Sequence, residues 1–323
     1  MGRTATMVCA CLALAALALA GAPPEAEVQG MYEGTWKTGA GEGKLVARVV
    51  ALGANAYKVF AIQHLPDDKT AKAEMDGKLD GDKVIFAGKD WSGTHAAGAV
   101  TGKIGADGSF EVKRIVPQSP TVGKKPPEGA VVLLDGKNFD QMTVRKDKQG
   151  KEPEWQVSED DGSVQIPRRG MRTKYATDGS YDLHVEFMCP LRADKRSQGR
   201  GNSGVHLTCG QEIQVLDSFG MTTYKGGGCG GLYRWKDPDA FDAFSLASYP
   251  PLTWQTYDVE YRVKRDAAGK PTGKPLLTVY HNGMKIHDAV PLNRRHRRGG
   301  LSFQDHGNPV RYRNIWVLPI EEK

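Results

Sequence analysis

The chain has 323 residues, of which 39% are hydrophobic and 39 are glycine. This length allows two domains, and the glycine content is typical of a loop-rich globular protein rather than a coiled coil or a disordered chain. The formal net charge of +6 is modest, and basic and acidic residues are interspersed over most of the length. The sequence therefore predicts no nucleic-acid partner.

The first 20 residues have the pattern of a secretory signal peptide. Arg3 is the only charge before Glu25, and the run from Met7 to Leu19 is apolar and rich in alanine and leucine. This run is too short to span a membrane comfortably, and it ends at a small-residue site, Ala18-Leu19-Ala20. We expect an exported protein, periplasmic or extracellular, that does not span the membrane.

Export of the protein determines which cysteines remain and whether they can form a disulfide. Cys9 and Cys11 leave with the signal peptide, and the remaining Cys189, Cys209 and Cys229 are an odd number. In an oxidising compartment, one disulfide plus one free thiol is the simplest outcome, and Cys209 with Cys229 is our preferred pair. Because the chain has no Cys-x-x-Cys pair, a zinc ribbon or thioredoxin-like site is not expected.

Residues 30–118 are predicted to form a small antiparallel β-domain, a barrel or meander. Short apolar or alternating runs are broken by glycine, asparagine and aspartate, with turn signals at Gly81-Asp82 and Ala106-Asp107-Gly108. This part carries no catalytic constellation. Residues 119–129, within VPQSPTVGKKPPEG, are rich in proline, lysine and glycine and are predicted to be an extended linker.

Residues 130–320 are again β-rich and lack a sustained helical period. In YDLHVEFMCP and WQTYDVEYRV apolar residues alternate with polar ones, and Asn282-Gly283 stands between two strand-like runs, a strong hairpin signal. Many strands over this length predict a large sandwich of two sheets. The oligomeric state cannot be inferred.

Three segments of this second domain, GNSGVHL, QEIQVLD and LSFQDHG, alternate apolar and polar side chains. A hairpin turn near Thr208–Gly210 would join the first two and bring His206 across from Glu212 or Gln214. If the three strands are neighbours, their polar faces form one groove. The polar residues are Asn202, His206, Glu212, Gln214, Ser302, Gln304 and His306.

Solvated sheet faces usually carry lysine, threonine, glutamate and serine, whereas amides and histidine beside glycine are typical of directed hydrogen bonds to a polyol. The pattern therefore suggests a carbohydrate groove, and a plain solvated face is the alternative. Two carboxylates, or a carboxylate and a histidine, could carry acid–base chemistry there.

The motifs LLDGKNFDQM, GRGNSGVHL, EIQVLDSFG, CGGLY and LSFQDHGNPVRYRNIWV occur in this order. Together they make residues 130–320 resemble the 3-keto-disaccharide hydrolase domain family. The resemblance implies an all-β fold, a concanavalin-like jelly-roll β-sandwich, preceded here by the small antiparallel β-domain. It also implies a hydrolase acting on glycosides whose sugar is a ketone at C3.

A C3 ketone acidifies the C2 hydrogen, so a base can start an elimination that expels the C1 oxygen, and water then adds to give the free keto sugar. With this chemistry, we expect Glu212 or His306 as the base, assisted by Asp305 or Asp217. The residues expected to bind the oxidised disaccharide or glycoside are Asn202, His206, Gln214, Gln304 and Trp254.

Other interpretations remain open at this point. The groove could belong to a non-catalytic carbohydrate-binding module. An ordinary glycosidase is disfavoured because Gln214 stands where a second strand carboxylate would be expected. No cofactor is expected, although Asp217, Asp305 and nearby carbonyls could hold Ca²⁺. The basic run from Arg294 to Arg298 is most simply an exposed loop, and an anionic sugar is the alternative.

Overall fold

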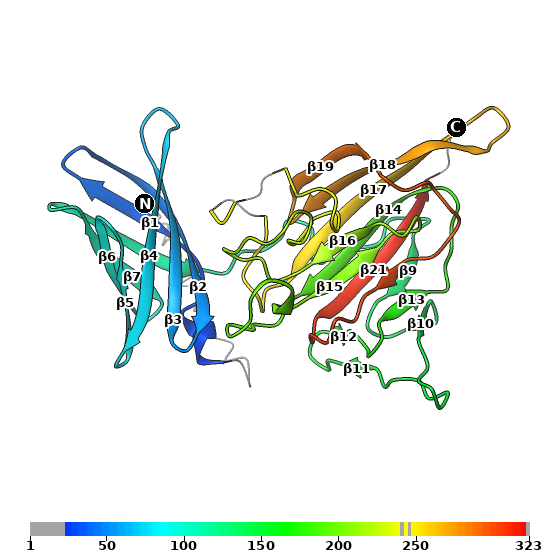
Figure 1. Ribbon diagram of the computed structural model, residues 1–323, viewed down its shortest axis with the longest axis horizontal. Coiled ribbons are helices and arrows are strands. Elements are labelled where there is room, and N and C mark those ends of the chain that lie inside the picture. The colour runs from blue at the N-terminus through cyan, green and yellow to red at the C-terminus, as the bar shows by residue number, and fades with distance from the viewer. Residues whose placement is uncertain (1–22, 240–241, 245–246, 321–323) are drawn as a thin grey trace, which may run out of the picture.

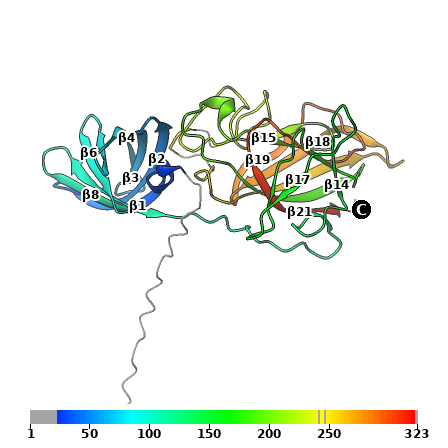
Figure 2. The ribbon, with the colours of Figure 1, turned by 90° about the horizontal axis from the view of Figure 1, so that it is seen from below.

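The computed structural model describes residues 23–239, 242–244 and 247–320, so the predicted signal peptide lies outside the described residues. Strands dominate, and the helices of the described part are short 3₁₀ turns, η1 (Pro24–Glu27) and η2 (Ser197–Gly199). None of its helices has the length and apolar character that a membrane crossing requires. Figures 1 and 2 show two units side by side, a barrel and a sandwich.

The N-terminal unit is a closed antiparallel barrel in which each strand pairs with the next and β1 pairs with β8. Alternate side chains point inward, and Tyr32, Val59 and Phe86 are buried in the barrel core. The expected turn at Gly81-Asp82 joins β4 to β5. The strands are β1 (Gly30–Thr38), β2 (Gly41–Gly53), β3 (Ala56–His64), β4 (Thr70–Asp80), β5 (Lys83–Ala87), β6 (Trp91–Ala96), β7 (Ala99–Ile104) and β8 (Gly108–Ile115).

The second unit is a sandwich of two antiparallel sheets. The larger sheet contains, in spatial order, β11 (Gln156–Val157), β12 (Val164–Gln165), β21 (Arg311–Ile320), β14 (Ser180–Met188), β17 (Gln255–Arg265), β18 (Pro271–His281) and β19 (Met284–Pro291), with β9 (Val131–Leu134) also paired to β21. The smaller sheet contains β10 (Met142–Val144), β13 (Met171–Thr173), β20 (Ser302–Phe303), β15 (Ser203–His206) and β16 (Glu212–Val215). The prediction of an all-β protein with a jelly-roll sandwich after a small antiparallel β-domain is confirmed.

The sandwich core lies between the inward faces of these sheets. Tyr257, Val259 and Tyr261 alternate along β17 and face Val205 and Ile213 of the smaller sheet across this core. The predicted Asn-Gly hairpin joins β18 to β19, and Asn282 and Gly283 have φ values of 51° and 79°. Positive φ at both positions is what a type I′ turn requires, so the dipeptide sets this register.

The proline-rich segment is bound along the outer face of the larger sheet. Gly123 N–H donates to Glu186 Oε1 at 2.5 Å, and Thr121 Oγ1 donates to Asp258 Oδ2 at 2.6 Å. Beneath it, His184 Nδ1 lies 2.9 Å from Asp258 Oδ1, and its Nε2 lies 3.5 Å from Glu186 Oε1. The segment is thus held by side chains of the sheet, while the predicted domain boundaries at 119–129 stay a prediction.

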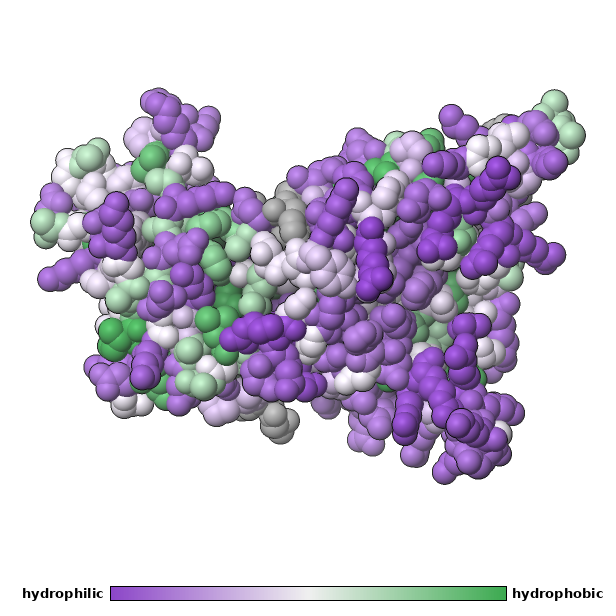
Figure 3. Space-filling view, in the orientation of Figure 1, coloured by the Kyte–Doolittle hydropathy of each residue, from purple (hydrophilic) through white to green (hydrophobic). Residues whose placement is uncertain are grey.

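The barrel contacts the sandwich through β2 and β3. Arg200 of the sandwich is fully buried, and its Nη1 donates to Ala51 O at 3.3 Å. Phe60 and Phe244 meet edge to face, with ring centroids 5.2 Å apart. In the orientation of Figure 1, the sandwich surface is mostly hydrophilic, whereas the barrel surface includes more hydrophobic residues (Figure 3).

Candidate functional site

The outer face of the smaller sheet brings together the predicted polar residues. Arg172 of β13 pairs with Ser302 of β20, Ser302 pairs with His206 of β15, and His206 pairs with Glu212 of β16. Directly paired residues of an antiparallel ladder point to the same face, so these four side chains form one row across the sheet. The expectation that the three segments are neighbours is confirmed, and His206 lies opposite Glu212.

Glu212 is the carboxyl group of this face, and its carboxylate accepts no hydrogen bond from the described residues. It is only 7% exposed. A Cβ built on Gly204, the diagonal neighbour of Glu212 on β15, would lie 2.8 Å from Glu212 Cδ and closer still to Oε1, so the missing side chain of Gly204 gives this carboxyl its place. Burial raises the pKa of Glu212 to about 7. A carboxyl group with this pKa is suited to proton transfer at neutral pH.

His206 accompanies Glu212 on the same row. Its Nε2 lies 4.0 Å from Glu212 Oε2, beyond hydrogen-bond distance. Burial, and then the positive charges of Arg294 and Arg172, lower the pKa of His206. The imidazole is therefore neutral at pH 7, and a neutral imidazole can donate one N–H and accept at the other nitrogen.

A cluster of amides lies beside Glu212. Asn202 Nδ2 and Gln214 Nε2 donate to Gln198 Oε1 at 2.9 Å and 2.8 Å, and Gln198 Nε2 donates to Gly227 O at 2.8 Å. Asn202 Oδ1 and Gln214 Oε1 are buried and have no hydrogen-bond partner within the described ranges. Buried amide oxygens normally find a donor, so these two are left to accept a hydrogen bond from a water molecule or from a ligand that reaches them.

Sequence reasoning missed two tyrosines and Gln198. Tyr233 N–H donates to Glu212 O at 3.1 Å, which places Tyr233 opposite Glu212 on the outer edge of β16. Its hydroxyl lies 3.0 Å from that of Tyr224, which is 42% exposed. Exposed aromatic rings beside a polar face can stack on sugar rings. No periodic signal marks these loop residues, because only the fold brings them to β16.

The QDHG motif after β20 has a different environment. Asp305 accepts the backbone N–H groups of Arg169 and Gly307, both at 2.8 Å, and His306 is exposed. Gln304 N–H donates to Gly204 O at 2.9 Å, which keeps Gln304 next to the row. A cleft of about 430 Å³ opens beside Asp305, a volume in the range of small-molecule sites. Asp305 and His306 thus lie near the end of the smaller sheet, away from the Glu212–His206 pair.

Asp217 and Trp254 do not join this face. Asp217 is buried in an ion pair with Arg200, at 2.7 Å from Arg200 Nη2, so it supports the contact with the barrel. Trp254 lies on the outer face of the larger sheet, where the Arg313 guanidinium sits 4.0 Å from its ring centroid. The structure places neither residue on the Glu212 face, because Asp217 continues the core-facing side of Ile213 and Val215, and Trp254 precedes β17 of the larger sheet.

The predicted disulfide is also wrong, since Cys189, Cys209 and Cys229 are all buried free thiols. Cys229 Sγ lies 3.1 Å from Tyr257 Oη, whereas the thiol of Cys209 lies beside Tyr261. Tyr257 and Tyr261 are four residues apart on β17, and four residues of an extended strand span about 13 Å. The two thiols therefore lie too far apart for one disulfide to bridge them.

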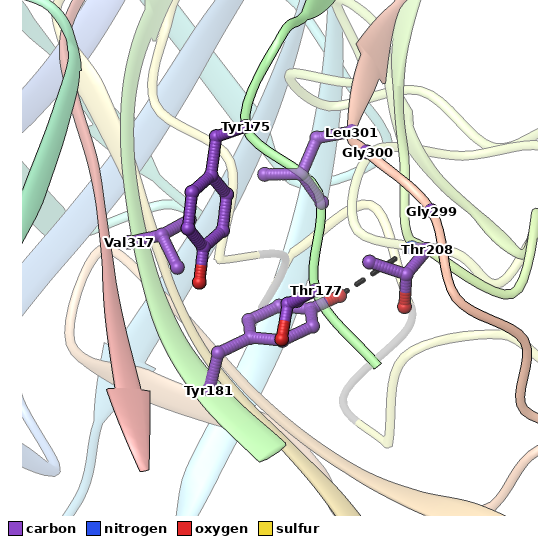
Figure 4. A pocket seen from close by; sticks show the side chains of 8 residues that line it. All are labelled: Tyr175, Thr177, Tyr181, Thr208, Gly299, Gly300, Leu301 and Val317. Carbon is purple, nitrogen blue, oxygen red and sulfur yellow. Dashed lines mark hydrogen bonds between the residues drawn. The ribbon is translucent and has the colours of Figure 1, made fainter. Parts of the chain in front are cut away.

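The structure does not support the calcium alternative at Asp217 and Asp305, because both carboxylates are bonded as above and lie on different elements. In the part of the chain that is described, no group of three or more histidine, cysteine, aspartate or glutamate residues could hold a metal ion. A narrow pocket between Tyr175, Tyr181 and Leu301 has no internal volume (Figure 4). The Thr208 N–H donates to Tyr181 Oη at 3.5 Å beside it, and without internal volume the pocket offers no room for a sugar.

Residues 129–318 match the family described as 3-keto-alpha-glucoside-1,2-lyase-like domain. This chain belongs to that family. The match spans both sheets and the Glu212 face, and it leaves out the barrel, β1 to β8.

Two solved structures are similar to part of this chain. One is a crystal structure of a "putative glycosyl hydrolase" from Parabacteroides distasonis, 29% identical over 60% of this chain and 85% of that chain, with a TM-score of 0.50. A second "putative glycosyl hydrolase" from the same organism is 18% identical over 60% of this chain and 95% of that chain, with a TM-score of 0.42. No curated protein matches the chain. The family and the first of these structures support a glycoside-acting, hydrolase-like protein with a carbohydrate substrate.

Proposed function

We propose that this protein cleaves 3-keto-glycosides by elimination at C1 and C2, followed by hydration, with Glu212 as the base. The observation that carries the proposal is the state of Glu212: buried, without a hydrogen-bond donor on its carboxylate, with a pKa of about 7, and on a polar face of amides and histidine. The family description, which refers to a 1,2-lyase, agrees with elimination across C1 and C2.

The Glu212 carboxylate takes the C2 proton, and the C–H electron pair moves toward C3, so the ketone becomes an enolate. The enolate then re-forms the C3 carbonyl, the displaced pair makes a C1–C2 double bond, and the C1–oxygen bond breaks. The leaving oxygen receives the proton held by Glu212. Addition of water across C1 and C2 gives the free keto sugar.

His206 and the amides would have supporting roles. The neutral His206 can donate its N–H to the developing enolate oxygen, the position where charge accumulates in the transition state. Asn202 Oδ1 and Gln214 Oε1 accept hydrogen bonds from sugar hydroxyl groups, which satisfies two otherwise unpaired buried oxygens. The exposed His306 fits the role of base less well, because it lies beyond the end of β20 and outside the row that holds Glu212 and His206.

Deuterium labelling tests this route directly. A 3-keto-disaccharide is cleaved in D₂O, and the released keto sugar is examined by NMR for deuterium at C2. Elimination and hydration place solvent deuterium at C2, whereas a direct displacement at C1 leaves the original hydrogen there. A product without label at C2 would sink the elimination mechanism.

The second candidate function is glycan binding without cleavage. The exposed ring of Tyr224, beside Tyr233 on the rim of the same face, favours it, because stacking on a sugar ring needs no chemistry. Binding of unoxidised disaccharides, together with no release of sugar from the 3-keto forms, would favour this candidate. In either case we propose that the protein is exported, since the apolar run from Met7 to Leu19 precedes the barrel.

A further inference from the structure

Two arginines beside the Glu212 face carry positive charge without a carboxylate partner. Some partly exposed cations have carboxylate partners: Arg262 Nη2 lies 2.6 Å from Asp182 Oδ1, and Lys58 Nζ lies 3.0 Å from Glu74 Oε2. Arg172 and Arg294 are both exposed, and neither has an ion pair with any residue that the structure describes. Their charge is therefore available to a ligand.

Arg172 is placed by the register of the smaller sheet. It lies on the same row as Ser302, His206 and Glu212, while its neighbour Met171 is buried in the core. Neighbouring strands are about 4.8 Å apart, so the backbone of Arg172 lies roughly 14 Å from that of Glu212, measured across three strand spacings. A ligand that reacts at Glu212 must extend beyond its reacting ring to meet this guanidinium.

Arg294 approaches from the loop between β19 and β20. Arg297 of this loop donates its Nε–H to Thr208 O at 3.2 Å, two residues beyond His206, which fixes the loop at the end of β15. After burial, Arg294 and Arg172 are the charges that act on His206, and both lower its pKa. The two arginines therefore flank His206 from different elements.

We propose that the substrate's second sugar, the one that leaves, carries an anionic group that Arg172 and Arg294 bind. This inference rests on the proposed function, since it takes the ring at Glu212 as the reacting one. A guanidinium forms two parallel hydrogen bonds with a planar or tetrahedral oxyanion, so a sugar carboxylate and a sugar sulfate share the chemistry required.

The rest of the face agrees with a charged sugar better than with nucleic acid. The amide oxygens of Asn202 and Gln214 and the carboxyl of Glu212 are hydrogen-bond acceptors, which suit hydroxyl groups and oppose a phosphate backbone. The net charge of +6 is spread over 323 residues with 38 acidic ones, unlike a basic stripe along a nucleic-acid groove.

Binding of unoxidised ligands tests the inference apart from catalysis. The probes are a hexuronate-containing disaccharide, the same disaccharide with its carboxyl reduced to the alcohol, and the reduced form carrying one 6-O-sulfate. Isothermal titration calorimetry at low salt should give at least about 10-fold tighter binding for an anionic probe than for the neutral one, the range of a charge-assisted hydrogen bond. The stronger of the two anionic probes identifies the source of the charge.

Variants locate the effect. Arg172→Gln and Arg294→Gln should each reduce the preference for the anion and leave binding of the neutral probe unchanged, while Arg172→Lys should keep part of it. Lys103→Gln, an exposed residue of β7 in the barrel, removes one positive charge elsewhere and should change nothing. Equal affinity for all probes, no binding of any, or an equal effect of Lys103→Gln would overturn the inference. Failure of the keto-sugar reaction alone would leave the anion preference intact, so the two proposals fail separately.

Discussion

The carboxyl of Glu212 occupies the space that a side chain at Gly204 would fill. The two residues are diagonal neighbours on β15 and β16, because Gly204 pairs with Gln214 and His206 pairs with Glu212. A Cβ at Gly204 would lie 2.9 Å from Glu212 Cγ and 2.8 Å from Cδ, distances that real Cβ atoms essentially never show. The position of the proposed base thus explains why the GNSGVHL motif has glycine at position 204.

Gly204→Ala should therefore displace Glu212 and lower kcat/KM on a 3-keto-disaccharide by about 100-fold, the size expected when a base loses its geometry. Steady-state kinetics on the folded variant measure this. Gly179→Ala is the matched control, because its Cβ would meet no atom closer than 3.7 Å. A Gly204→Ala enzyme of normal activity would contradict the placement of the base.

Glu212→Gln should stabilise the protein at alkaline pH. The pKa of Glu212 rises from 4.5 to about 7 in the folded state, so the wild type loses stability as pH increases between these values. The buried charge costs about 3 kcal/mol above pH 7, and the neutral amide avoids this cost. Thermal unfolding should show a higher Tm for Glu212→Gln at pH 8.5, with little difference at pH 4.5. A variant of equal or lower Tm at pH 8.5 would show that the carboxylate is well solvated.

The same proton affinity predicts the pH dependence of catalysis. Because the base must be ionised, kcat/KM should rise with pH through about 7 and level off above it. The measurement is a pH–rate profile on a 3-keto-disaccharide over a range in which the fold is intact. A profile already flat at pH 5 would exclude a base with this pKa.

His184→Asn should loosen the proline-rich segment on the other side of the sandwich. Burial opposes protonation of His184, but Asp258 and Glu186 outweigh it and raise its pKa above 6.5. Because the pKa of His184 is raised in the folded state, its charged form stabilises the protein fully below pH 6.5. This stabilisation is lost as pH rises through the pKa of His184 in the folded protein. Removing the imidazole takes one cationic partner from Asp258 and Glu186, which keep Lys124 and Arg313, and should destabilise the protein by about 2 kcal/mol below pH 6.5.

Trypsin reports on the same segment, because Lys124 lies within it and is followed by Lys125. Cleavage after Lys124 should be faster in His184→Asn than in the wild type, and His64→Asn, at an exposed barrel residue, should behave as the wild type. Unchanged cleavage and unchanged Tm in His184→Asn would mean that the histidine does not secure the segment.

Alternation and turn signals predicted the small β-domain and the two-sheet sandwich, whereas the jelly-roll arrangement came from the family resemblance. The polar positions of β15, β16 and β20 form one face because their period of two matches the pleat, and the turn at Thr208–Gly210 pairs His206 with Glu212. Alternation could not predict which residues of other elements each side chain contacts. Asp217 and Trp254 have suitable chemistry, but one meets Arg200 and the other Arg313.

The residues that the sequence did not reveal lie outside the strands, Gln198 in η2 and Tyr233 in the segment after β16. Gln198 and Tyr233 reach the face only because the segments around them fold over the edge of β16. The disulfide prediction failed for a related reason. Cys229 approaches Tyr257 and Cys209 approaches Tyr261, and these two tyrosines are four residues apart on β17. Long-range placement of this kind leaves no periodic trace in the sequence.

The most direct test of the central claim compares the wild type and Glu212→Gln on a 3-keto-disaccharide and on its unoxidised parent, with release of the leaving sugar as the measurement. We predict cleavage of the keto form alone, with a loss of at least about 100-fold in the variant, the size expected for removal of a general base. Cleavage of the unoxidised parent, or an unchanged rate in Glu212→Gln, would contradict the account.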